Sequence, residues 1–463
     1  MMEQRSHKKW WILGAMGSVL GLVVLDETVV GVALPTLRAD LGMSAATSHW
    51  VVNAYLLVFT TLAVAGGRLC EIFGMRRLFL AAVLLFGAAS MACGFAPSGG
   101  WLIAARALQG VGAAVIFPAS IAIITIVFPP EQRGLAFGLH TTVGGICMSL
   151  GPLVGGLFTE FISWRWIFWV NLPLVALVAG VILLFWTTGD EPEQNSESAD
   201  LPAWRKVDWL GFFWLGTSLL CLVMAMMQAP DWGWFSPIIW ALALAALPGF
   251  WAFWRREVAL SKIDKTAPLV DFDLLKIPTF SSGCLMVFAA QFGKIAVIIF
   301  GALYIQERLK LSPLEAGLVL LATFLPTLGT SLFAGHLADR MGPRRPMILG
   351  AAIHGTALFA LAAAALSDSL LFFLPAAVLW GAFMPFMFVP SRRGALNATP
   401  ADLRGLAGGL SMTAQLLGGT VGMAFCGLLS LVSGSFAVVF IAAGLVVWVS
   451  VWAAWRFFEA DAV

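Results

Sequence analysis

The chain has 463 residues, of which 60% are hydrophobic and 11% are charged, with a formal net charge of +2. A soluble domain carries about 25% charged residues, so this composition excludes a water-soluble surface and predicts a membrane protein. No nucleic-acid-binding patch, hydrolase triad, phosphate-binding loop or metal-ligand spacing is visible, and the 6 cysteines stand singly in apolar stretches. We therefore expect neither an enzyme nor a metal site.

Apolar segments long enough to cross a bilayer recur along the whole chain. A spanning helix needs about 20 mainly apolar residues, and the sequence predicts an all-α polytopic protein of about fourteen such spans. They are expected near residues 10–34, 47–66, 78–96, 101–125, 134–158, 166–187, 209–229, 235–254, 279–303, 314–335, 347–366, 370–390, 404–429 and 434–455. The first is too long for a signal sequence and is interrupted by Asp26, so we expect it to be retained.

The basic residues are segregated between alternate loops. Cytoplasmic loops of membrane proteins hold an excess of Lys and Arg. With the N-terminus inside, only four of the 27 Lys and Arg residues fall in loops on the other side, namely Arg38, Arg165, Arg308 and Lys310. This asymmetry predicts a multi-pass protein of the cytoplasmic (inner) membrane with both termini in the cytoplasm.

Two charged segments divide the predicted spans into groups of six, two and six. We expect an N-terminal six-helix bundle over 1–190 and a C-terminal six-helix bundle over 278–463. Between them, residues 191–277 would form cytoplasmic linkers and two additional membrane helices, with an acidic linker at 188–208. The two additional helices hold few charges, so we expect them to pack outside the bundles and not to line a transport path.

An internal repeat relates the two bundles. The loop GRLCEIFGMRR (67–77) recurs as GHLADRMGPRR (335–345), displaced by 268 residues, and RGLAFGL (133–139) recurs as RGLAGGL (404–410). Two echoes in the same order indicate duplication, which predicts pseudo-symmetric halves.

The repeated loop resembles the signature of the major facilitator superfamily, Gly-x-Leu-x-Asp-x-x-Gly-x-(Lys/Arg), and fourteen spans resemble its drug:proton antiporter branch. The resemblance implies that these loops take part in switching between inward-open and outward-open states. The candidate switch residues are Gly67, Glu71, Gly74, Arg76, Arg77, Gly335, Asp339, Arg340, Gly342 and Arg344. In the first copy Glu71 replaces the Asp, and a plain positively charged loop is the alternative interpretation.

The first span contains LDETVVGVALP (25–35), which resembles the first-helix signature of the fourteen-span exporters, with Gly31 in place of its Asn. A charge at bilayer depth costs about 2.5–3.5 kcal/mol, so Asp26 and Glu27 should face protein or water. Neighbouring helix positions lie about 100° apart, and we expect Asp26 in a central cavity and Glu27 against a neighbouring helix. Burial disfavours a charged carboxylate, so this pair could take up a proton; the alternative is a permanent ion pair.

The fourth span contains LIAARALQGVGAA (102–114), which is similar throughout to the family's pattern Leu-x-x-x-Arg-x-x-Gln-Gly-x-Gly-Ala-Ala. Arg106 and Gln109 fall on one helical face. The resemblance links the arginine to proton coupling, so the candidate coupling residues are Asp26, Glu27 and Arg106. A purely structural pairing of the buried guanidinium is the alternative.

The fifth span contains GLHTTVGGICMSLGPLVGG (138–156), which resembles the antiporter signature, with Cys147 at its second Gly position. The motif residues are Gly138, Gly151, Pro152, Gly155 and Gly156. Small residues on one stripe permit close helix approach, and ordinary packing would also favour them. The order Gly-Pro-x-x-Gly-Gly is typical of exporters in the family, and it therefore indicates efflux.

Lys294 is an ammonium inside the ninth span. Its number is that of Asp26 plus 268, so the two residues are expected at pseudo-symmetric positions, and Lys294 could face Asp26 or Glu27 across a central cavity. Such a pair could exchange protons or be split by an anionic substrate; a lysine that extends to the outer surface is the alternative. The candidate cavity residues are Asp26, Gln109, His140, Gln291, Lys294 and Gln415.

The resemblance implies a major facilitator fold and a proton-coupled exporter of hydrophobic or amphiphilic small molecules that works by alternating access. We expect protons as the coupling ion, no other cofactor, and a monomer in the lipid bilayer. A solute importer on the same fold and a non-transporting membrane receptor are the alternatives.

Overall fold

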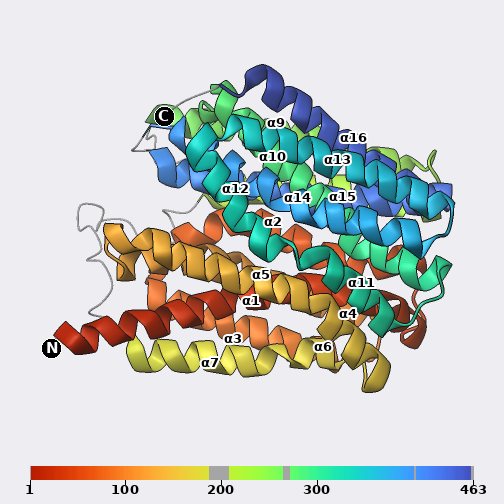
Figure 1. Cartoon of the computed structure of the whole chain (residues 1–463), viewed down its shortest axis with the longest axis horizontal. Helices are drawn as coiled ribbons and strands as arrows, with labels where there is room; N and C mark the ends of the chain where they lie inside the picture. The colour runs from red at the N-terminus through yellow and green to blue at the C-terminus, as the bar shows by residue number, and fades with distance from the viewer. Residues whose placement is uncertain (1, 187–207, 264–271, 401–402, 460–463) are drawn as a thin grey trace.

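The computed structural model describes residues 2–186, 208–263, 272–400 and 403–459, and within these ranges some side chains, including that of Glu71, lie outside the description. Most of the predicted acidic linker is therefore outside the described residues, as is the environment of Gly67. The described residues form helices joined by short turns (Figure 1).

The N-terminal bundle is built from the first seven helical segments, which lie in the lower half of Figure 1. Their bounds are α1 Met2–Asp40, α2 Ala45–Phe73, α3 Met75–Gly94, α4 Gly99–Val127, α5 Pro130–Phe161, α6 Trp166–Trp169 and α7 Asn171–Phe185. Helix α1 packs against α5, and α4 packs against both α2 and α3. Helices α6 and α7 together form one apolar span.

Two helices follow the N-terminal bundle, α8 (Trp209–Trp232) and α9 (Pro237–Ile263), with a short 3-10 turn η4 (Leu274–Lys276) after them. Helix α8 packs against α2 of the N-terminal bundle and α15 of the C-terminal bundle. On the α2 side, Asn53 Nδ2 donates to Met227 Sδ at 2.7 Å. Helix α8 therefore covers the line along which α2 and α15 meet, and α9 packs against α8.

Most of the C-terminal bundle lies in the upper half of Figure 1, and α11 reaches down to pack against α5. The bounds in this bundle are α10 Pro278–Ile295, the π-helical segments η5 Ala296–Gly301 and η6 Tyr304–Arg308, α11 Pro313–Phe324, α12 Thr327–Met341, α13 Arg344–Leu366, α14 Leu370–Asn397, α15 Arg404–Ser433 and α16 Phe436–Phe457. Segments η5 and η6 continue α10 as one apolar span, as α12 continues α11. Helix α10 packs against α14, α15 and α16 at the centre of this bundle.

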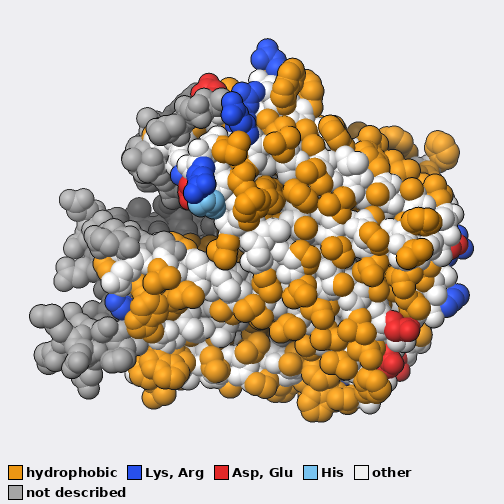
Figure 2. All heavy atoms as spheres, in the orientation of Figure 1, with side chains coloured by type: hydrophobic (Ala, Val, Ile, Leu, Met, Phe, Trp, Pro, Cys, Tyr) orange, Lys and Arg blue, Asp and Glu red, His pale blue; other side chains and the backbone are white. Residues whose placement is uncertain are grey.

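The chain is a multi-pass membrane protein. In the described residues, 13 helices are long and apolar enough to cross a bilayer. Helix α2, with 29 residues, also reaches membrane length, so the count fits the fourteen expected. The outer surface is covered by large apolar side chains (Figure 2), such as Leu184, Leu332 and Leu371, which are 75%, 76% and 78% exposed. An exposed apolar surface of this extent suits lipid and not water.

The two bundles meet closely at one end of the molecule. Both chain termini lie at the other end (Figure 1), which we call the terminal end. At the opposite end, Arg38 Nη1 of α1 lies 3.0 Å from Glu307 Oε1 of η6. Beside this ion pair, Gln306 Nε2 donates to the Val32 carbonyl at 2.8 Å. The opposite end is therefore closed by polar contacts between the halves.

Candidate functional site

Asp26 is held inside the N-terminal bundle by three side chains from two other helices. Its carboxylate accepts from Arg106 Nη1 of α4, from Gln109 Nε2 at 2.8 Å, and from Asn171 Nδ2 of α7 at 3.2 Å. Asp26 and Arg106 are each 1% exposed, so this is a fully buried ion pair. Ser90 of α3 completes the cluster by accepting from Asn171 Nδ2 at 2.9 Å. The amide and guanidinium donors compensate a buried carboxylate that would otherwise be costly.

Arg106 is fixed from several sides. Its Nε donates to the Val51 carbonyl at 3.0 Å, and Nη1 also donates to Gln109 Oε1 at 2.7 Å. The guanidinium carbon lies 4.3 Å from the centre of the Tyr55 ring. A planar guanidinium can bind a carboxylate, a carbonyl and an aromatic face at once, which a lysine cannot do.

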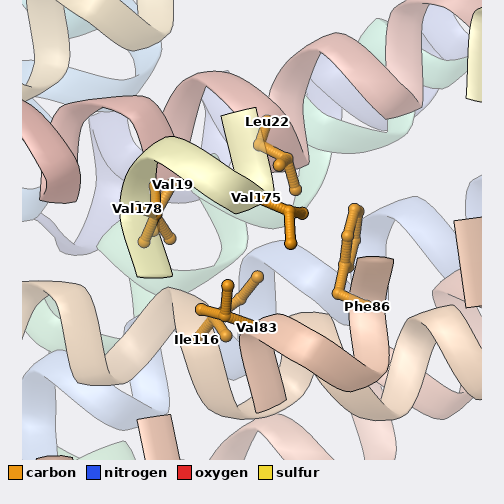
Figure 3. A pocket seen from close by; sticks show the side chains of 7 residues that line it. All are labelled: Val19, Leu22, Val83, Phe86, Ile116, Val175 and Val178. Carbon is orange, nitrogen blue, oxygen red and sulfur yellow. The ribbon is translucent and has the colours of Figure 1, made fainter. Parts of the chain in front are cut away.

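An apolar layer lies between the Asp26 cluster and the terminal end. It surrounds a void of about 10 Å³ (Figure 3), lined by Val19, Leu22, Val83, Phe86, Ile116, Val175 and Val178. Leu22, Phe86 and Val175 each lie four residues, one helical turn, from Asp26, Ser90 and Asn171 respectively. A void this small without polar partners does not hold water stably. Within the N-terminal bundle, Asp26 is therefore separated from the terminal end by dry packing.

Glu27 faces the other bundle. Its Oε2 lies 2.8 Å from Lys294 Nζ, and its Oε1 accepts from Gln291 Nε2 at 2.9 Å, both on α10. Glu27 and Lys294 are 8% and 5% exposed. Close backbone packing supports the contact, since a Cβ at Gly31 would lie 2.9 Å from the Ile298 carbonyl oxygen in η5. Glu27 and Lys294 therefore join the halves at mid-depth.

A chain of polar side chains runs from this ion pair toward the terminal end. Gln291 Oε1 accepts from Gln415 Nε2 of α15 at 3.3 Å, and Gln415 Oε1 accepts from Arg392 Nη2 of α14. Gln291 is buried, whereas Gln415 and Arg392 are partly exposed. Gln291 and Gln415 were expected from the sequence as cavity residues, and Arg392 was not.

The two carboxylates on α1 contact different halves of the molecule. We expected Asp26 to face the central cavity and Glu27 to contact a neighbouring helix; Asp26 is bonded within the N-terminal bundle, and Glu27 contacts α10 of the C-terminal bundle. Sequence reasoning could not decide this, because it gives the angle between adjacent residues but not the rotation of α1. Lys294 meets Glu27, which is one of the two partners expected for it.

Two further cavity candidates also lie inside the N-terminal bundle. Gln109 is fully buried and bonded to Asp26 and Arg106, away from the contact between the halves. His140 is 3% exposed, with Nε2 3.5 Å from Ser120 Oγ of α4. In this conformation both side chains pack between helices of the N-terminal bundle, and their place in a substrate cavity stays a prediction.

The glycines of the fifth-span motif lie where α5 meets α1 and α11. A Cβ at Gly151 would lie 1.9 Å from Thr28 Oγ1, and one at Gly155 would lie 2.9 Å from the Val29 carbonyl oxygen. On the other side, a Cβ at Gly156 would lie 2.5 Å from the Pro313 carbonyl oxygen. The contact of α5 with α1 and its contact with α11 therefore both require glycine.

Of the remaining motif positions, Pro152 has a close contact with α11 and Gly138 has none. Gly317 of α11 packs on the Pro152 carbonyl, where an added Cβ would be 2.4 Å away, while a Cβ at Gly138 would meet nothing within 4 Å. The close approach of α5 and α11 at the opposite end thus depends on Gly156 and Gly317, and Gly138 has no such contact here.

Each of the two repeated loops turns at a glycine with positive φ. Gly74, between α2 and α3, has φ of 93°, and Gly342, between α12 and α13, has φ of 76°, a region that favours glycine. In the second copy Asp339 forms an ion pair with Arg393 of α14. That partner falls just beyond the span predicted to end at residue 390, which is why the sequence analysis missed both Arg392 and Arg393.

The arginines of these loops bind backbone carbonyls. Arg76 Nη2 donates to the Leu183 carbonyl at 3.4 Å and Arg344 Nη2 to the Trp455 carbonyl at 2.6 Å, each at the end of the last helix of its own bundle. Arg77 and Arg340 are exposed.

Ser90 and Asn171, which belong to the Asp26 cluster, were not predicted from the sequence, since a lone serine or amide in an apolar span gives no distinctive sequence signal.

Comparison with known proteins agrees with this architecture. The model of the Major Facilitator Superfamily matches residues 16–254 and 283–462. The chain is 35% identical to the puromycin resistance protein of Streptomyces alboniger, over 90% of this chain and 81% of that one. It is 30% identical to the tetracenomycin C resistance and export protein of Streptomyces glaucescens, over 91% and 76% of the two chains. A solved D-xylose-proton symporter has the same fold, with a TM-score of 0.69 at 16% identity over 98% of both chains.

Proposed function

Because the chain belongs to the major facilitator superfamily, we propose that it exports hydrophobic or amphiphilic small molecules by alternating access, driven by protons. Relatives named for resistance and export, including the puromycin and tetracenomycin C proteins, support efflux. The observation on which the proposal rests is the placement of two adjacent carboxylates. Asp26 is bound within the N-terminal bundle and Glu27 is bound to the C-terminal bundle, so α1 links proton chemistry to the contact between the halves.

The proposed proton step occurs at Asp26. A proton on this carboxylate removes its charge, and the bond from Arg106 then becomes weaker, because hydrogen bonds between ionised partners are roughly twice as strong as neutral ones. Arg106 would turn toward its other acceptors, Gln109 and the Val51 carbonyl. A change of helix packing at α1 and α4 would follow, and Glu27 on the next position of α1 would move relative to Lys294.

The orientation follows from the charged loops. We place the terminal end in the cytoplasm of a bacterial inner membrane, with the molecule acting as a monomer and requiring no cofactor. The contacts between Arg38 and Glu307 and between Gln306 and Val32 then close the extracytoplasmic side. The dry layer on the cytoplasmic side of Asp26 favours proton entry from outside, as an exporter driven by inward proton flow requires. Each charge moved through the field supplies about 2.3 kcal/mol per 100 mV.

Transport by the purified full chain in proteoliposomes tests the proposal. With a pH gradient imposed and puromycin as the first probe, we expect gradient-dependent movement of the probe against its concentration, and loss of that movement when an ionophore collapses the gradient. A small panel of amphiphilic dyes would extend the test beyond the relative's substrate. Movement in the direction of proton flow would support an importer instead, and the absence of any gradient-dependent movement across the panel would contradict transport.

A further inference from the structure

The charged side chains at the centre of the molecule are not balanced. Asp26 pairs with Arg106 and Glu27 pairs with Lys294. Arg392 is a third cation, and in the described part of the chain its hydrogen bond is to the neutral amide of Gln415, with no carboxylate in ion-pair range. The group therefore holds one positive charge more than its carboxylates compensate.

Arg392 is within the helix and points inward. It lies five residues before the end of α14, about 7.5 Å along the axis, and it contacts Gln415, which lies eleven residues into α15, about 16 Å along that helix. The next residue, Arg393, forms an ion pair with Asp339 near the end of the helix. Arg392 is thus separate from the loop contacts, and its guanidinium extends toward the middle of the bundle.

Arg392 begins the polar chain that ends at the Glu27–Lys294 pair. Exposure falls along this chain, from partly exposed Arg392 and Gln415 to Gln291 at 2% and Lys294 at 5%. A molecule entering from the terminal end would meet Arg392 first. Phe288 is partly buried and lies three residues before Gln291, on the same face of α10.

We propose that Arg392, with the amides of Gln415 and Gln291 beside it, forms an anion-binding site, and that the exported molecules include amphiphiles with a carboxylate or sulfonate group; this inference rests on the proposed export function. An anion would supply the missing negative charge, and a guanidinium binds a planar or tetrahedral oxyanion through two parallel donors. The apolar part of the bound amphiphile would lie against Phe288.

Binding to the full chain in lipid nanodiscs tests the site. The probes are 8-anilinonaphthalene-1-sulfonate and N-phenyl-1-naphthylamine, which differ by one sulfonate. We expect the wild type to bind the sulfonate more tightly, and Arg392→Gln to raise its Kd by about tenfold or more, since a hydrogen bond to a charged group contributes that much. The Kd of the neutral probe should stay within about twofold, which also shows that the variant is folded. Arg392→Lys should recover part of the loss.

Arg456→Gln is the matched control, because Arg456 is an exposed arginine at the terminal end of α16 and its loss removes the same charge from the same bundle. It should leave both Kd values unchanged. Equal binding of the two probes by the wild type, or an equal effect of Arg392→Gln and Arg456→Gln, would overturn the anion site. If the neutral dye still moved with the pH gradient in proteoliposomes, the proposed export would stand; if neither dye nor puromycin moved, the export proposal would fail separately.

Discussion

The Lys294 ammonium lies 2.8 Å from the Glu27 carboxylate, and this ion pair joins α1 of one bundle to α10 of the other. Residue 26 sits beside Glu27 on α1 but pairs with Arg106 inside its own bundle. A single turn of α1 therefore contacts both halves through charged groups. A change in the charge of either carboxylate therefore acts on the helix that carries the other carboxylate.

The first prediction concerns the Glu27–Lys294 pair. Glu27→Gln and Lys294→Gln should each lower the free energy of unfolding by about 3–5 kcal/mol, because each leaves one buried charge without a partner. The double variant removes both charges and should recover most of that loss. Thermal unfolding of the wild type, the two single variants and the double variant in nanodiscs measures the interaction energy between Glu27 and Lys294.

The exposed pair between Arg38 and Glu307, about one-third exposed on each side, provides the control for this cycle. Its single and double neutralisations should each change the free energy of unfolding by no more than about 1 kcal/mol. Strictly additive losses at Glu27 and Lys294 would show that the two side chains do not interact in the membrane.

The second prediction concerns Arg106. Arg106→Lys keeps the charge, but one ammonium cannot reach both Asp26 and the Val51 carbonyl, which the guanidinium binds through different nitrogens. Gradient-driven transport should fall at least about tenfold while the protein remains folded. The matched substitution Arg255→Lys, at an exposed arginine on α9 beside Trp251, should leave the rate unchanged. Wild-type rates in Arg106→Lys would argue for a charge-only role.

The third prediction concerns the close contact of α5 and α11. Gly156→Ala would place a methyl group 2.5 Å from the Pro313 carbonyl oxygen, so the opposite end cannot close as it does here. Overpacking of this kind costs about 1–3 kcal/mol and should favour the conformation open at that end. A cysteine introduced at buried Val32 should then react faster with an impermeant maleimide, and transport should slow.

Gly180→Ala on α7 is the control for this substitution, since a Cβ there would meet nothing within 4 Å. It should change neither the maleimide reaction nor transport. If Gly156→Ala behaved like Gly180→Ala, the contact would have no part in closing the opposite end.

The fourth prediction concerns Asp339 and Arg393. The side chains are 63% and 43% exposed, so breaking the pair with Asp339→Asn should change the free energy of unfolding by less than about 1 kcal/mol. Transport should nevertheless slow several-fold if the pair takes part in switching between conformations. The charge reversal Asp339→Arg with Arg393→Asp should restore much of the rate; failure of the reversal, despite normal expression, would indicate a role other than their mutual attraction.

Much of the fold could be predicted from the sequence because lipid imposes simple rules. Apolar length gives the spans, the loop repeat gives two related halves, and Gly74 and Gly342 indeed occupy equivalent turns. The family resemblance was confirmed by the match to the superfamily model. These features depend on local composition and spacing, which a single sequence contains.

The site could be predicted only in part. The intramembrane residues Asp26, Glu27, Arg106 and Lys294 were found because charge in an apolar span is costly. Their pairing was not fixed, because it depends on the rotation of each helix, which packing sets. Arg392 was missed for a related reason, since charge near a helix end looks like a loop until the neighbouring helix is known to cover it.

Neutralisation of Asp26 in the transport assay shows whether Asp26 exchanges the coupling proton. In proteoliposomes, Asp26→Asn should still bind puromycin and equilibrate it across the membrane without a gradient, but should not concentrate it when a pH gradient is imposed. Concentration of puromycin by Asp26→Asn to the wild-type level under the same gradient would contradict the account.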